Sequence, residues 1–96
     1  MGKEEDFSKV IKVVAELADL SERDILGKSR KQEIVDARWM SVYLMEEKGY
    51  STREIAELFN EPIRTINHAI RNFPDRARYS NNGLGNIFFM ARQQLR

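Results

Sequence analysis

The polar side chains best suited to contact a nucleic acid lie in the segment RTINHAIR. Arg64, His68 and Arg71 follow one another at helical spacing, so they share one side of a helix, and Thr65 and Asn67 flank them. An arginine can make a bidentate hydrogen bond to guanine O6 and N7, and an asparagine can do so with adenine N6 and N7. We therefore interpret this side as a nucleic-acid-reading face, with Arg64, Asn67 and His68 as base contacts. The alternative for Asn67 and His68 is hydrogen bonding within the fold.

A helix-turn-helix pattern over residues 51–73 would carry this face on its second helix. Ser51 and the glutamate three residues later form a capping box, which predicts that the first helix begins at Ser51. Asn60 is the next plausible cap, and Pro62 is tolerated only in the first turn of a helix, where its missing N–H costs nothing. The second helix is therefore predicted to begin at about Glu61.

Apolar side chains at helical spacing indicate which side of each helix faces the core. In the second helix of the motif, four such side chains are expected to be buried, namely Ile63, Ile66, Ile70 and Phe73. In the first helix the apolar edge consists of Ile55, Leu58 and Phe59.

Four further helices are predicted outside the motif. They lie at residues 4–18, between Ser21 and Gly27, at 31–47 and at 84–95. The helix at 31–47 is the longest and should pass through the middle of the fold. The short second helix should be anchored by Leu20, Ile25 and Leu26. Because alternating Val/Ile/Thr runs are missing, we predict one all-α domain over residues 1–96.

The chain after the second helix of the motif is predicted to form a loop and then a final helix. Pro74 begins this stretch, and residues 80–83 read Ser-Asn-Asn-Gly, a sequence typical of loops. The final helix carries a dense apolar cluster that must be covered, at Ile87, Phe88, Phe89 and Met90. We favour docking of this cluster onto the domain itself, and a homodimer or another protein partner is the alternative.

Charge is distributed unevenly, although the net charge is only +1. Residues 1–26 hold four Lys/Arg against seven Asp/Glu, residues 27–60 hold six against six, and residues 61–96 hold six against two. The segment KSRK at 28–31 adds three positive charges before the longest helix. A polyanion can bind such a basic region because phosphate binding depends on local contacts. The alternative is that the C-terminal arginines only solvate a helix and a tail.

Several classes of function find no support in the sequence. The lack of cysteine excludes a disulfide framework and a thiolate metal site, and one histidine excludes the usual multi-histidine sites. No phosphate-binding loop is present, so we expect no nucleotide, no cofactor and no enzymatic activity. No apolar run approaches the ~20 residues that cross a bilayer, and no signal peptide is recognisable. We expect a soluble, cytoplasmic protein associated with the nucleoid.

The segment from Gly27 to Phe73 resembles the C-terminal DNA-binding domain of the bacterial replication initiator DnaA. The matching motifs are GKSRKQEI at residues 27–34, Ala37 with Arg38, Ser51 with Ile55, and TINHA at residues 65–69. Leu20 and residues 24–27 match the family's preceding L-x-x-x-D-(I/L)-L-G, and the resemblance covers about residues 7–73.

This resemblance implies a six-helix fold like that of the Trp repressor, whose helix-turn-helix places its second helix in the major groove of double-stranded DNA. It also implies that Arg30, in the basic loop, enters the minor groove. Phosphate contacts are implied for the positions that match the family's backbone-binding residues, which are Arg38, Ser51, Thr52, Arg53 and Thr65. We expect further phosphate contacts from three cations beside these positions, Lys28, Lys31 and Arg71.

The sequence departs from the family at the positions that read bases. The family signature R-D-H-T-T-V corresponds to residues 61–66, so Pro62, Ile63 and Arg64 replace Asp-His-Thr. We therefore expect a DNA-binding regulator of replication or transcription with an altered sequence preference. The alternative is a protein-interaction module that has kept the fold and lost DNA binding.

Overall fold

The computed structural model describes residues 2–80 and 82–96, and these residues form helices and connecting segments without a strand. The six helices are α1 (Lys3–Ala18), α2 (Glu22–Leu26), α3 (Gln32–Glu47), α4 (Thr52–Phe59), α5 (Ile63–Tyr79) and α6 (Leu84–Gln94). The predicted all-α fold is confirmed, with a helix at each of the six predicted places. Within the described ranges, none of the helices is long and apolar enough to cross a membrane.

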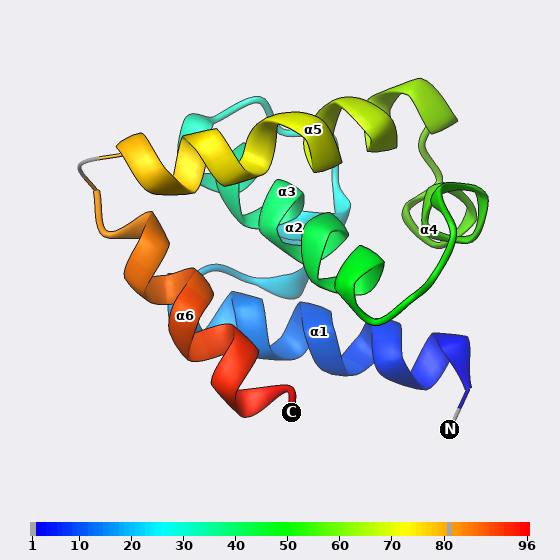
Figure 1. Ribbon diagram of the computed structural model, residues 1–96, viewed down its shortest axis with the longest axis horizontal. Coiled ribbons are helices and arrows are strands. Elements are labelled where there is room, and N and C mark those ends of the chain that lie inside the picture. Colours follow the sequence, from blue (N-terminus) through cyan, green and yellow to red (C-terminus); the bar gives the residue numbers. More distant parts are fainter. Residues whose placement is uncertain (1, 81) are drawn as a thin grey trace.

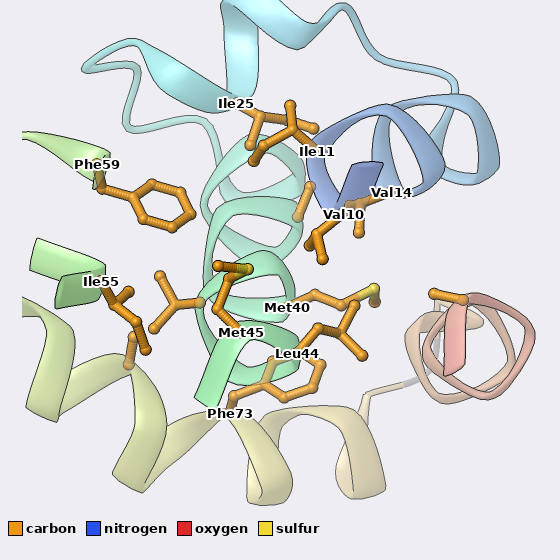
Figure 2. Close-up of a cluster of buried hydrophobic side chains, with 14 of the residues drawn as sticks. Val10, Ile11, Val14, Ile25, Met40, Leu44, Met45, Ile55, Phe59 and Phe73 are labelled. Carbon is orange, nitrogen blue, oxygen red and sulfur yellow. The ribbon is translucent and has the colours of Figure 1, made fainter. Parts of the chain in front are cut away.

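Helix α3 lies at the centre of the fold and contacts all five other helices. In Figure 1, α5 crosses above α3 and α1 runs beneath it. Figure 2 shows labelled side chains of α1, α2, α3, α4 and α5 converging on one apolar cluster. Its buried members include Val10 and Val14 of α1, Ile25 of α2, Met40 and Met45 of α3, Ile55 and Phe59 of α4, and Phe73 of α5. Burial of this apolar surface is the main force that positions the helix-turn-helix.

Local capping begins and ends the first helix of the motif. Ser51 Oγ accepts a hydrogen bond from the Glu54 N–H at 3.1 Å, and the Glu54 carboxylate accepts one from the Ser51 N–H at 2.9 Å. The predicted capping box is therefore confirmed. The prediction that Asn60 caps the second helix is wrong. Asn60 instead ends α4 with a left-handed φ of 55°, which asparagine tolerates better than most residues, and α5 begins later than predicted, at Ile63 after Pro62.

Helix α5 continues through Pro74 to Tyr79, so the predicted loop after Phe73 is wrong over its first part. Proline deprives the carbonyl four residues earlier of its helical hydrogen bond, and this costs free energy. Tertiary contacts of the added turns offset that cost. The guanidinium of Arg76 pairs with the buried carboxylate of Asp36 on α3 through two hydrogen bonds, at 2.8 and 3.1 Å.

Two predicted core residues are exposed. Ile66 and Phe73 are buried and Ile70 is partly buried, as their spacing predicts, but Ile63 is exposed at the start of α5. Leu26 is likewise exposed at the end of α2. Both lie at a helix end. An apolar stripe is covered only as far as the neighbouring helices extend beside it.

The apolar cluster of α6 is divided between core and solvent. Ile87 and Phe88 pack against the core, and the rings of Phe88 and Phe73 make an edge-on contact with their centroids 5.0 Å apart. Phe89 and Met90 are exposed. The predicted docking onto the domain therefore holds for Ile87 and Phe88 and is wrong for the other two, because one side of a helix cannot bury four consecutive side chains.

Candidate nucleic-acid interface

Five polar residues of α5 line one shallow hollow, Arg64, Thr65, Asn67, His68 and Arg71. All five are exposed. In the part of the chain that the structure describes, neither Arg64 nor Arg71 forms an ion pair. The structure thus brings together Arg64, His68 and Arg71, which the helical spacing placed on one side, and the flanking Thr65 and Asn67, in one exposed hollow.

His68 is held from two directions. Its ring lies edge-on to Trp39 of α3, with ring centroids 5.3 Å apart. The Asn72 side-chain amide lies 3.2 Å from His68 Nδ1 and donates a second hydrogen bond to the His68 carbonyl at 2.8 Å. Because the amide nitrogen is a donor, Nδ1 is the acceptor in this contact, and Nε2 is the ring nitrogen left to donate. The alternative of hydrogen bonding within the fold therefore applies to Nδ1, while Nε2–H remains a donor.

Sequence reasoning missed Asn72, although a signal was present. Asn72 lies four residues after His68, the spacing at which side chains on one helix meet. Trp39 is partly buried and packs against the edge of the core. Its contact with His68 could not be derived from the sequence because the two residues lie on different helices.

The basic loop between α2 and α3 lies beside α5. A groove of about 540 Å³ is lined by Lys28, Ser29 and Arg30 of this loop, by Arg38 and Trp39 of α3, and by Thr65 and His68 of α5. Arg30 is exposed, with no ion pair to any of the described residues. The predicted minor-groove side chain and two of the residues of the α5 face therefore border a single groove.

Arg38 holds the basic loop in shape. Its guanidinium donates hydrogen bonds to the carbonyl oxygens of Ile25 at 2.8 Å, Ser29 at 3.1 Å and Asp24 at 3.2 Å. Partial burial lowers the pKa of Arg38, and the negative charge of Glu61 opposes this shift. Arginine has five N–H donors, so those that remain could still reach a phosphate. The phosphate contact of Arg38 stays a prediction, whereas its three hydrogen bonds to carbonyl oxygens show that it positions the loop.

Lys28 joins the basic loop to the turn of the helix-turn-helix. Its Nζ lies 2.6 Å from the Glu61 carboxylate and donates a hydrogen bond to the Asn60 carbonyl at 3.2 Å. Glu61 lines the same groove as Arg30. The carboxylate therefore lowers the positive potential of the groove and neutralises Lys28, which the sequence pattern presented as a free cation.

The remaining predicted phosphate contacts lie at helix starts. The Ser51 hydroxyl is engaged in the cap, and hydrogen bonds from Ser51 lower the pKa of Glu54. Thr52, at the start of α4, is partly buried. Arg53 is exposed and lines a hollow with residues of the turn, including Ile63. Lys31 is exposed just before α3. The roles of all four stay predictions.

The acidic residues do not suggest a metal centre. Across residues 2–80 and 82–96, no group of three or more His, Asp or Glu side chains could hold a metal ion.

Comparisons with known proteins identify the family of the chain. Residues 7–72 match the family described as "Bacterial dnaA protein helix-turn-helix". The chain is also 33% identical over 64 residues to the chromosomal replication initiator protein DnaA of Pseudothermotoga lettingae. This match covers 66% of the chain but only 14% of that relative, so the chain corresponds to a small part of it. The chain belongs to the bacterial DnaA helix-turn-helix family of DNA-binding domains.

Proposed function

We propose that this chain binds double-stranded DNA and regulates replication or transcription, with α5 in the major groove and Arg30 in the minor groove. The observation that carries the proposal is the hollow on α5, where five exposed polar side chains face solvent on the second helix of a helix-turn-helix. Proteins with this motif place the N-terminal part of that helix against the base edges.

The base contacts would come from Arg64, Asn67 and His68. Arg64 can fork onto guanine, Asn67 onto adenine, and His68 Nε2–H can donate to an acceptor on a base edge. Each bidentate contact contributes ~1–3 kcal/mol of discrimination against a wrong base. Arg30 would respond to the negative potential of a narrow minor groove, and this favours A·T-rich DNA beside the major-groove site.

The sequence preference would differ from that of the replication initiator. Pro62 and Ile63 stand where the family carries polar base readers, and neither side chain can form a hydrogen bond. Arg64 brings a forked cation to the third of these positions. We therefore expect guanine to be favoured at the base pair that Arg64 contacts.

Titration of labelled duplex DNA at several salt concentrations tests this proposal. If Arg30, Lys31, Arg53 and Arg71 each neutralise one phosphate, the logarithm of affinity should fall with that of salt with a slope of about −3.6. That slope corresponds to a loss of about 150-fold between about 50 and 200 mM salt.

Arg64→Ala should weaken binding to a selected site by roughly 5- to 150-fold, since it removes one bidentate contact of ~1–3 kcal/mol. Arg78→Ala is the matched control, because Arg78 is an exposed arginine at the other end of α5. No binding of any duplex at low salt would sink the proposal.

A protein-interaction role through α6 is the second candidate, and the exposed side chains of Phe89 and Met90 favour it. Figure 1 shows α6 on the opposite side of the molecule from the N-terminal turn of α5, so this role does not compete with DNA binding for the same surface. Sedimentation of the wild-type chain and of Phe89→Ala tests self-association. A wild-type chain that stays monomeric at high concentration excludes the homodimer.

A further inference from the structure

We infer that Ile63 sets part of the sequence preference by contacting the C5-methyl group of a thymine in the major groove. This inference rests on the proposed DNA binding by α5. It assigns a base to Ile63, which occupies a position where the family carries a hydrogen-bonding side chain.

The first observation is the exposure of Ile63. Isoleucine is among the residues most often buried, yet Ile63 is 39% exposed. It is the first residue of α5 and lines the hollow at the turn between α4 and α5, together with Arg53 and Pro62. Its neighbour Arg64 is exposed as well. An apolar group therefore stands in solvent at the end of the helix that approaches base edges in this type of motif.

The second observation concerns the groups beside it. Asn67 lies one turn after Ile63, so the two residues share a side of α5, and Asn67 is exposed in the hollow. One turn advances the helix by about 5.4 Å, which is on the order of two base-pair steps. The base that meets Ile63 should therefore lie within about two base pairs of the one that meets Asn67.

The chemistry of the major groove selects thymine. Thymine presents a C5-methyl group there, and apolar side chains contact it, whereas the other bases present donors and acceptors. An isoleucine against those groups would remove them from water without replacing their hydrogen bonds, and this costs free energy. Ile63 thus favours thymine by an attractive contact and disfavours the other bases by desolvation.

The test uses deoxyuridine, which lacks the methyl group of thymine and keeps its hydrogen-bonding groups. Bound duplexes are first selected from a random pool with the wild-type chain, and each thymine of the selected site is then replaced singly by deoxyuridine. One replacement near the predicted adenine should weaken wild-type binding about fourfold, equivalent to ~0.8 kcal/mol for one buried methyl-sized group. Ile63→Ala should bind the thymine and deoxyuridine duplexes equally well.

Two variants serve as controls. Met90→Ala truncates an apolar residue of similar exposure, 43%, on α6 and should keep the wild-type difference between the two duplexes. Ile63→Val keeps a branched apolar side chain and should retain most of the difference in affinity between the thymine and deoxyuridine duplexes. Thermal unfolding of each variant confirms that the fold is kept.

The outcomes separate this inference from the proposed function. Wild-type binding that is insensitive to every methyl group overturns the inference and leaves DNA binding intact. A methyl effect that persists in Ile63→Ala also overturns it. Failure to bind the random pool at all overturns the proposed function, and the inference with it.

Discussion

Replacement of Glu61 by glutamine is expected to strengthen DNA binding. The Glu61 carboxylate lies 2.6 Å from Lys28 Nζ and lines the groove that also contains Arg30. It therefore neutralises one cation and would repel an approaching phosphate. Glutamine keeps the shape and a hydrogen-bond acceptor but removes the charge, so Lys28 becomes free to contact the DNA backbone.

The expected magnitude follows from the number of phosphates contacted. One more neutralised phosphate makes the slope of log affinity against log salt more negative by ~0.9, which raises the ratio of affinities at about 50 and 200 mM salt by roughly 3.5-fold. The fold should tolerate the change. The Lys28 side chain is 66% exposed, and ion pairs that open to solvent contribute about 0–1 kcal/mol to the free energy of unfolding.

Fluorescence anisotropy of a labelled duplex over a series of salt concentrations measures the affinity and the slope of log affinity against log salt. Lys28→Met leaves Glu61 without its cation and should weaken binding. The double variant Lys28→Met/Glu61→Gln has the net charge of the wild type and should bind much as the wild type does, because the two changes compensate within one pair. A Glu61→Gln variant with unchanged affinity and slope would refute the reasoning that DNA senses this carboxylate.

Two further predictions concern the framework. Arg76→Ala leaves the Asp36 carboxylate, which is 2% exposed, without its bidentate partner, and it should lower the free energy of unfolding by about 2–3 kcal/mol. This loss is smaller than for a fully buried pair because the Arg76 side chain is 36% exposed. An unchanged denaturation midpoint would contradict this role. The Tyr50 hydroxyl donates a hydrogen bond to the Asp6 carboxylate at 2.6 Å, which is the main cause that raises the pKa of Tyr50 to about 12. The bonded phenol is neutral, so its stabilising contribution is complete below the unfolded pKa of about 10 and is lost as the pH rises through about 12. Tyr50→Phe should therefore flatten the fall in unfolding free energy over this range, and an identical pH profile in both proteins would speak against it.

The helix-turn-helix shows how far local sequence reasoning reached. The capping box at Ser51 was predicted correctly because it is formed by two residues three positions apart. The burial of Ile66 and Phe73 was predicted correctly because apolar spacing marks the side of a helix that faces the core. The same reasoning failed at Pro74, where the local preference of proline opposes a helix. Tertiary contacts of the following turn, above all the pair between Arg76 and Asp36, outweigh that preference.

The candidate interface divides in the same way. Helical spacing was sufficient to place Arg64, His68 and Arg71 on one side of α5, since a helix repeats every 3.6 residues whatever surrounds it. Spacing could not reveal that Lys28 is paired or that Arg38 supports the basic loop. Lys28 and Glu61 are 33 residues apart in the sequence, and no period links such positions.

By itself, then, the sequence determined the places of the six helices, the capping box at Ser51, the exposed polar side of α5 and the family, because these depend on interactions between residues near in sequence or on a continuous motif. Only the tertiary structure decided which charges are free. It left Arg30, Arg64 and Arg71 without ion pairs among the described residues, and it neutralised Lys28. It also left Ile63 exposed at the start of α5. The physical reason is that pairing and burial depend on which helices lie side by side, and the packing around α3 sets that arrangement.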